Sequence, residues 1–331
     1  ELKAIVLREY GGPEVLRVEE IPEPQVSCPY DAKVAVYATA LNRADVLQRR
    51  GKYPQPGPKP QHEVPGLEFC GVVEEVGSQV LEWKVGDRVM GLLAGGGYAE
   101  YVVTHERMLM PIPQDFSFHE AAAIPEVFLT AYDALFFKGR MEIGDMVLIH
   151  AGGSGVGTAA IQLAKVGGAS RIFVTAGSVE KCERTVKLGA DRAVNYKEEN
   201  FADVVLCETG GRGVDVILDF IGKPYLDGNT KAAAMDGRIV QIAVMGGAKG
   251  EVDLGAFMNK RLTLVGTTLR ARPIEQKIAL TQRFRKEILP LFESSRLKPI
   301  VDTAFPLERA AEAHRYMEEN RNFGKIILAV R

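Results

Sequence analysis

The feature that most limits the fold of this chain is an apolar run, a glycine-rich turn and an alanine-rich stretch between Val147 and Ala164. That order predicts a buried strand, a tight turn and the start of a helix. Glycines let the backbone approach a diphosphate, which the free N–H groups at a helix N-terminus stabilise. A serine replaces the middle glycine of the G-x-G-x-x-G pattern. We therefore expect a dinucleotide site built from Ser154, Gly155, Val156 and Gly157.

Two patterns divide the chain into two domains. Residues 1–125 contain short strand-like runs punctuated by glycine, which indicates a β-rich fold. Residues 126–267 alternate apolar strand-length runs with helix-length segments, as in a parallel sheet. Beyond them we expect a helix over 273–292, an amphipathic helix with Leu307, Ala311 and His314 on one face, and a strand over 325–330. The predicted fold class is α/β, with residues 1–125 and 268–331 in a discontinuous β-rich domain and 126–267 in a doubly wound domain.

The composition excludes several classes of protein. The net charge of −2 predicts no nucleic-acid partner. The apolar runs are far shorter than the roughly 20 residues that cross a bilayer, so we expect no membrane span. The four cysteines lie far apart without a C-x-x-C pair, which argues against a zinc ribbon or a disulfide framework. Together with the lack of a signal pattern, this predicts a cytoplasmic protein.

The end of the second predicted strand of the 126–267 domain bears on the choice of cofactor. NAD enzymes usually place an acidic residue there, which holds the ribose 2′-hydroxyl. This chain instead reads Thr175-Ala176-Gly177-Ser178, which leaves room for a 2′-phosphate. Ser178 could donate a hydrogen bond and Lys181 a positive charge, so we expect NADPH. The alternative is that Lys181 is an ordinary solvated helix lysine, which the neighbouring Glu180 favours.

Further segments show a resemblance over the whole chain. They are Ala40-Leu41-Asn42-Arg43-Ala44-Asp45, Gly66-Leu67-Glu68, Ala121-Ala122-Ala123-Ile124-Pro125, Leu129-Thr130-Ala131-Tyr132 and Gly324-Lys325-Ile326. Together with the glycine turn, they resemble the zinc-free quinone oxidoreductases of the medium-chain dehydrogenase/reductase superfamily. Other segments look most like the tumour-suppressor-inducible type within that family; they are 51–54, 148–152, 175–178 and 195–197.

This resemblance implies a GroES-like catalytic domain formed by both chain ends, a central Rossmann domain and a cleft between them. In zinc-dependent relatives Cys, His and Cys hold the catalytic metal, and the matching positions here look like Asn42, Leu67 and Glu126. A leucine cannot bind zinc and an amide is a poor ligand, so we expect no catalytic zinc. The cysteine-rich lobe that carries the structural zinc also looks absent.

The resemblance further implies hydride transfer from NADPH to a quinone, or release of single electrons. A quinone needs less polarisation by a Lewis acid than a simple carbonyl does. Tyr53 is the expected catalytic residue, which could orient or protonate the product, although it could also be an aromatic lid. Asn42 should lie near the nicotinamide, and Asp45 should hold the local backbone. The other expected cofactor contacts are Thr130, Gly177, Tyr196, Met245, Gly246, Asn322 and Lys325.

Two alternatives stay open from the sequence. The same cleft could reduce α,β-unsaturated aldehydes or ketones, because hydride adds to an electron-poor carbon in either case. The chain could also be a non-catalytic NADPH-binding redox sensor or structural protein. The family resemblance implies a homodimer or homotetramer.

Overall fold

The computed structural model describes residues 1–331, which form two compact units. Unit 1 consists of Glu1–Leu129 and Leu269–Arg331, and unit 2 of Thr130–Thr268. The first boundary therefore lies inside helix α3 (Pro125–Tyr132) rather than before it. A boundary within a helix leaves no change of periodicity, which is why the sequence pattern places it slightly earlier.

Unit 2 is built around a six-stranded parallel sheet. Its strands are β8 (Met146–Ile149), β9 (Arg171–Ala176), β10 (Arg192–Asn195), β11 (Val214–Asp219), β12 (Ala233–Gln241) and β13 (Thr263–Gly266). Their order is β10-β9-β8-β11-β12-β13. Numbered from β8, this is the 3-2-1-4-5-6 order of the Rossmann fold, so the predicted doubly wound domain is confirmed.

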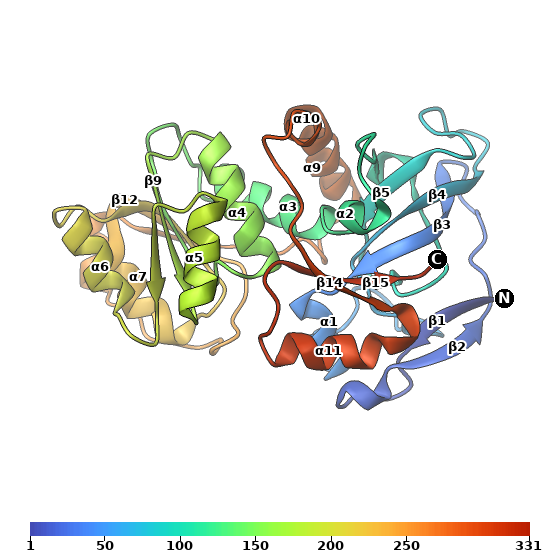
Figure 1. Ribbon diagram of the computed structural model, residues 1–331, viewed down its shortest axis with the longest axis horizontal. Helices are drawn as coiled ribbons and strands as arrows, with labels where there is room; N and C mark the ends of the chain where they lie inside the picture. Colours follow the sequence, from blue (N-terminus) through green and yellow to red (C-terminus); the bar gives the residue numbers. More distant parts are fainter. The chain divides into compact units, whose positions relative to one another are not determined.

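Helices connect these strands and cover the sheet (Figure 1). They are α4 (Gly155–Val166), α5 (Val179–Leu188), α6 (Phe201–Glu208), α7 (Leu226–Ala232) and α8 (Leu254–Lys260), with a π-helix at Asp133–Lys138 and a 3-10 turn at Lys223–Tyr225. Leu148, Phe173 and Ile217 of the central strands are fully buried. Burial on both faces explains the continuous apolar runs that marked these strands in the sequence.

Unit 1 contains a seven-stranded sheet and a separate two-stranded one. The large sheet comprises β3 (Asp31–Ala40), β4 (Glu68–Val76), β5 (Arg88–Leu92), β6 (Tyr101–His105), β7 (Leu109–Pro111), β14 (Val301–Pro306) and β15 (Lys325–Ala329). The small sheet pairs β1 (Leu2–Val6) with β2 (Arg17–Ile21). Strand β15 pairs antiparallel with β3, with Ile327 opposite Ala40. The last strand of the chain therefore lies in the same sheet as strands from its first part.

The helices of unit 1 differ in two details from the sequence expectation. They are α1 (Arg43–Arg49), α2 (Phe118–Ala122), α3, α9 (Ile274–Glu287), α10 (Leu289–Glu293) and α11 (Ala310–Glu318), with 3-10 turns at Pro13–Val15, Glu106–Met108 and Leu307–Arg309. The single helix predicted over 273–292 is wrong, because Pro290, in the first turn of α10, has no N–H with which to continue the hydrogen-bond ladder of α9. In α11 Ala313 and His314 are buried, whereas Ala311 is only half-buried.

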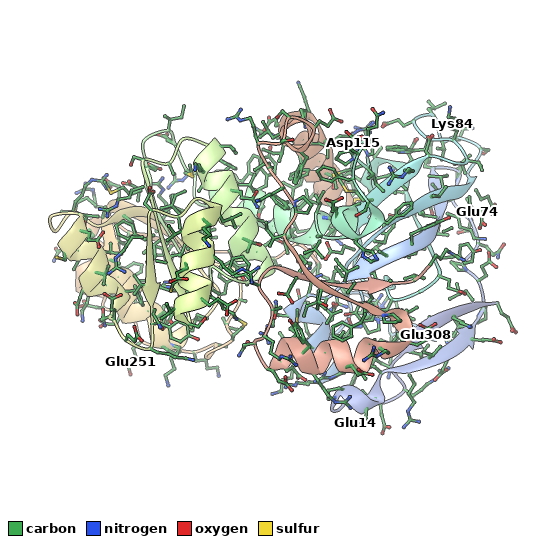
Figure 2. All side chains as sticks on the ribbon, viewed as in Figure 1. Glu14, Glu74, Lys84, Asp115, Glu251 and Glu308 are labelled. Carbon is green, nitrogen blue, oxygen red and sulfur yellow. The ribbon has the colours of Figure 1, made fainter.

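The surface of both units is charged. Glu14, Glu74, Lys84, Asp115 and Glu308 of unit 1 and Glu251 of unit 2 are exposed (Figure 2). No helix has the length and apolar character needed to span a bilayer.

Candidate functional site

The glycine turn joins the end of β8 to the start of α4. The Ser154 hydroxyl caps α4 by accepting a hydrogen bond from the Gly157 N–H at 3.0 Å. We expected the Gly157 amide to face a diphosphate, but the serine already uses it. The N–H groups of Gly155 and Val156 begin the helix and have no acceptor within it. These two donors and the positive end of the helix dipole are the groups of the turn that are suited to an anion.

The other predicted cofactor contacts of unit 2 follow the carboxyl ends of its parallel strands. Gly177 and Ser178 follow β9, Tyr196 follows β10, and Met245 and Gly246 follow β12. Chain order reverses at β8, which lies between β9 and β11, and in doubly wound sheets ligands bind beside such a reversal. The sheet therefore brings this set to the edge at which a dinucleotide would bind.

Tyr196 and Ser178 shape one end of this edge. A methyl group on Gly177 would lie 2.5 Å from the Tyr196 hydroxyl, so the half-exposed tyrosine ring packs on the glycine. The Ser178 hydroxyl caps α5 by accepting from the backbone N–H of Lys181 at 3.2 Å. Since a hydroxyl that accepts can also donate, Ser178 retains a donor for a ligand oxygen.

A buried hydrogen-bond chain ties the glycine turn to the loop after β11. Thr175 lies 2.9 Å from Nδ1 of His150, and Nε2 of His150 lies 2.7 Å from Oδ1 of Asn229. Asn229 donates to Asp219, which also accepts from the backbone of Ile221 at 2.5 Å. Because the amide oxygen only accepts, the His150 proton is on Nε2. Burial lowers the pKa of His150, so this ring is a neutral structural link.

In unit 1, Asn42 is held in a buried cluster by residues from three parts of the chain. Lys325 donates to Oδ1 of Asn42 at 2.8 Å, and Nδ2 of Asn42 donates to Oε1 of Glu68 at 2.9 Å. The Lys325 ammonium also lies 2.7 Å from the same Glu68 oxygen. An inverted amide would place its oxygen against a carboxylate and its NH₂ against an ammonium. The ion pair thus fixes the amide orientation and leaves one Nδ2 hydrogen available.

Lys325 is more deeply engaged than the sequence suggested. It is 3% exposed, and its third acceptor is the carbonyl of Leu41 at 2.7 Å. An ammonium has three hydrogens, so the protein supplies an acceptor for each of them. Its contact with a cofactor stays a prediction, whereas its contact with Asn42 is part of the structure. No three His, Cys, Asp or Glu side chains form a group that could hold a metal ion.

Asp45 fixes the start of α1, as the family resemblance implied. Its carboxylate accepts from the Asn42 backbone N–H at 2.8 Å and from the Tyr98 hydroxyl at 2.8 Å. Burial raises the pKa of Asp45 to about 6. His314 lies 3.1 Å from Tyr98, and burial and Arg49 lower the pKa of His314 to about 3. Asp45 therefore holds the segment that carries Asn42.

The remaining predicted residues are Tyr53, Asn322 and Thr130. Tyr53 is half-buried, and the Arg270 guanidinium stacks on its ring with 4.9 Å to the ring centroid. Asn322 bonds within its own loop, to the carbonyl of Gly324 at 2.9 Å. Thr130 is buried in α3.

Sequence reasoning missed three polar residues of these clusters. Glu68 was noted only as part of a family segment, and neither His150 nor Arg270 was assigned a role. A single buried charged or polar residue produces no periodic pattern, so the sequence offered no signal for Arg270. For Glu68, an acidic residue at the start of an apolar strand is such a signal, because buried carboxylates need a partner.

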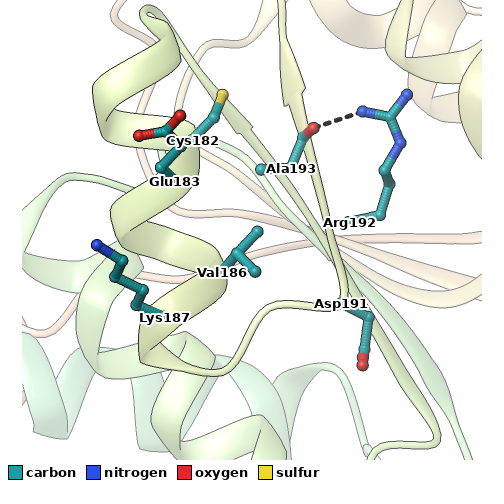
Figure 3. A pocket seen from close by; sticks show the side chains of 7 residues that line it. All are labelled: Cys182, Glu183, Val186, Lys187, Asp191, Arg192 and Ala193. Carbon is teal, nitrogen blue, oxygen red and sulfur yellow. Dashed lines mark hydrogen bonds between the residues drawn. The ribbon is translucent and has the colours of Figure 1, made fainter.

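A hollow on the outer side of unit 2 is a poorer candidate site. It lies between α5 and β10 and is lined by Cys182, Glu183, Val186, Lys187, Asp191, Arg192 and Ala193 (Figure 3). Its arginine is already paired with Glu199 and Glu208 at 2.8 Å each. Burial raises the pKa of the Cys182 thiol, so the reactive thiolate is scarce. The hollow thus offers no activated nucleophile, and its arginine is already neutralised.

Comparisons with known proteins assign the family. A model described as alcohol dehydrogenase GroES-like domain matches residues 29–114, and one described as zinc-binding dehydrogenase matches residues 188–328. Quinone oxidoreductase from Rattus norvegicus is 31% identical over 334 residues, covering 99% of this chain and 97% of its own.

Two solved structures are similar over the whole chain. An NAD-dependent alcohol dehydrogenase has 38% identity and a TM-score of 0.89, covering 99% of this chain and 100% of its own. Mycobacterial Rv1454c complexed with NADPH has 29% identity and a TM-score of 0.89, covering 100% of both chains. The GroES-like and Rossmann domains are thus confirmed, and the chain belongs to the quinone oxidoreductases of the medium-chain dehydrogenase/reductase superfamily.

Proposed function

We propose that this chain reduces a quinone with NADPH by hydride transfer, without a catalytic metal. The observation that carries the proposal is the Asn42 amide of unit 1, whose orientation the Lys325–Glu68 ion pair fixes. Unit 2 by itself adds a glycine turn whose Gly155 and Val156 N–H groups have no acceptor within the helix. The positions at which zinc-dependent relatives hold their metal are Asn42, Leu67 and Glu126 by resemblance. In this chain the cation that contacts Asn42 is the ammonium group of Lys325.

Each group of the chain would have one task. The N–H groups of Gly155 and Val156 would hold the diphosphate, and the available Nδ2 hydrogen of Asn42 would orient the nicotinamide end. The cofactor supplies a hydride. Tyr53 would orient the acceptor and give its hydroxyl proton to the reduced product. The protein thus contributes to the reaction by holding the reactants close together and by placing fixed charges beside them.

An acceptor screen tests this function and its rivals. Consumption of NADPH is followed with ortho-quinones, with short α,β-unsaturated aldehydes and without an acceptor. Faster turnover with quinones supports the proposal, and faster turnover with the aldehydes supports the enone reductase. NADPH binding without turnover of any acceptor would instead indicate a redox sensor or structural protein.

The proposed preference for NADPH depends on the end of β9, where small residues stand in place of an acidic one. The similar structures include one described as NAD-dependent and one complexed with NADPH, so kinship supports either cofactor. Ser178 retains a hydroxyl donor, and Lys181 lies in the first turn of α5. Both suit a 2′-phosphate. A reducing cytoplasmic location, which fits the four free cysteines, also belongs to the proposal.

Replacing Lys181 with alanine should weaken NADPH binding about 10- to 100-fold and leave NADH binding unchanged. The reason is the loss of one charge-assisted hydrogen bond of about 1.5–3 kcal/mol. Fluorescence titration with both cofactors measures the change. Lys187→Ala, in the last turn of the same helix, is the control and should alter neither affinity. An unchanged ratio of affinities in Lys181→Ala would remove this residue from the account.

We further propose a homodimer that forms along the β13 edge of unit 2. This strand ends the sheet, so one side of its backbone is unpaired. Helix α8, which precedes this strand in the chain, has no buried residue, and its Leu254 and Met258 are 76% and 74% exposed. They are spaced i,i+4, so they share one face of the helix. A second copy pairing along β13 would cover both the open edge and these apolar side chains.

Met258→Glu should convert such a dimer into monomers. A carboxylate in an apolar interface should weaken association at least ~10-fold, because burying an unpaired charge is costly. Sedimentation or size-exclusion measurements would then give the mass of one chain, 36.2 kDa, rather than twice that value. Ile143→Glu is the control, since Ile143 is an apolar residue of unit 2 that is 89% exposed but lies outside β13 and α8. A parent protein that sediments as a monomer would contradict the proposal.

A further inference from the structure

Arg270 is a buried arginine of unit 1 whose contacts are all with neutral groups. It is 5% exposed. Its Nε donates to the Ala94 carbonyl at 2.8 Å, one terminal nitrogen to the Tyr53 carbonyl at 3.0 Å, and the other to the side-chain oxygen of Gln48 at 2.8 Å. No carboxylate contacts this guanidinium.

The other buried cations of unit 1 with polar contacts are neutralised directly. Arg49 lies 2.6 Å from Glu318, and Lys325 lies 2.7 Å from Glu68. The hydrogen-bond network of Arg270 reaches an acidic group only through Gln48. The Gln48 side-chain amide accepts from Arg270 and donates to Glu63 at 3.0 Å. Lys277 of α9 is also buried, and its charge repels that of Arg270. Asp45, Glu63 and Glu126 attract the charge of Arg270, but none of them is among its hydrogen-bond partners.

Burying a cation without a carboxylate in contact with it is costly, and such cost is found where a protein binds an anion. Burial lowers the pKa of Arg270, but an arginine stays protonated in proteins. A guanidinium has five N–H groups and three are used here, so two remain. The same guanidinium stacks on the ring of Tyr53, the residue assigned to the acceptor above.

We propose that Arg270 is a further catalytic residue, whose guanidinium contacts the carbonyl oxygen of the hydride acceptor and stabilises the negative charge that forms there. This inference rests on the proposed function. The contact would use the two N–H groups that the protein leaves without an acceptor.

The proposed reaction consists of a hydride transfer followed by a proton transfer. The C4–H bond of the reduced nicotinamide breaks, and its hydrogen and electron pair form a new bond to the acceptor. The cofactor is oxidised and the acceptor is reduced by two electrons. As the new bond forms, the π bond of the acceptor's carbonyl breaks, and its electron pair moves to the oxygen as a negative charge. A proton from the Tyr53 hydroxyl then neutralises that oxygen, and water restores the hydroxyl. Arg270 acts between these two transfers.

Kinetics of two variants test the catalytic effect. Arg270→Gln should lower kcat with a quinone by about 100- to 1000-fold, as loss of an oxyanion donor does. Arg270→Lys keeps the charge and should retain more of the rate. The control is Arg88→Gln, because Arg88 also donates to a backbone carbonyl, that of Phe116 at 2.7 Å, and stacks on a ring, that of Phe118 at 4.8 Å. Equal losses in Arg270→Gln and Arg88→Gln would overturn the proposal.

A binding measurement separates this inference from the proposed function. With saturating NADP⁺, 4-nitrophenol mimics the oxyanion, and its absorbance reports its ionisation. Bound to the parent, its pKa should be at least ~1 unit lower than in water, as an opposite charge nearby causes. Arg270→Gln should abolish the shift and Arg270→Lys keep part of it. Absent binding, or the same shift in Arg270→Gln, overturns the role of Arg270. A shift that requires Arg270, found in a protein that reduces no acceptor, would instead refute the proposed function.

Discussion

Lys325→Met should lower the free energy of unfolding by about 3–5 kcal/mol, the largest stability effect expected from one side chain of the Asn42 cluster. The substitution leaves Glu68, which is 0% exposed, as a buried charge without its cation. Removing one partner of a buried ion pair costs this much because the remaining charge is no longer compensated. Denaturation by urea measures the change.

Two further variants show whether the ion pair itself is the cause. The double variant Glu68→Gln/Lys325→Met removes both charges and should recover most of the lost stability, since a neutral replacement for a buried pair is often harmless. Lys231→Met breaks the exposed Lys231–Asp227 pair of α7 and should cost less than about 1 kcal/mol. A double variant as unstable as Lys325→Met would contradict this account.

The double variant also tests what the ion pair does for Asn42. With both charges gone, nothing forces the Asn42 oxygen toward residue 325, and the amide can turn over. The double variant would then regain most of the parent's stability but reduce the acceptor more slowly than the parent. If the double variant regained both the stability and the rate of hydride transfer, the ion pair would stabilise the fold without affecting catalysis.

The parts of the molecule that the sequence predicted well are those in which neighbours in sequence are neighbours in space. The strand, turn and helix from Val147 onward form one continuous unit, and buried parallel strands are continuous apolar runs. Strand β10 was not predicted because only two apolar residues, Ala193 and Val194, stand between Arg192 and Asn195. Short strands with little burial produce no periodic signal.

The contacts that build the candidate site join distant parts of the chain. Lys325 and Asn42 are 283 positions apart, and Arg270 and Tyr53 are 217 apart. One sequence contains no record of such pairings. The family resemblance supplied Asn42 and Tyr53, but the groups that hold them, Glu68 and Arg270, emerged only once the sheet of unit 1 had placed them.

Gly157→Ala should prevent tight NADPH binding, because the glycine turn has no space for a side chain at this position. A methyl group there would lie 2.2 Å from the carbonyl oxygen of Ala151 and 2.9 Å from the backbone of Gly152. The colliding atoms are backbone, so the turn itself must move. Ala151 has little freedom to adjust, since it already adopts a positive φ of 49°.

The displaced turn should cost about 1–3 kcal/mol of stability, as overpacking does. It should also weaken NADPH binding by at least ~100-fold, which corresponds to about 2.7 kcal/mol of lost diphosphate contacts. Gly144→Ala is the control. Gly144 lies before β8 with φ of 92° and nothing within 4 Å of an added methyl group, so alanine there costs only its left-handed backbone, about 1–2 kcal/mol. The two variants should thus be similarly destabilised, but only Gly157→Ala should lose the cofactor. If Gly157→Ala bound NADPH as tightly as Gly144→Ala, the diphosphate would have to lie elsewhere than against Gly155 and Val156.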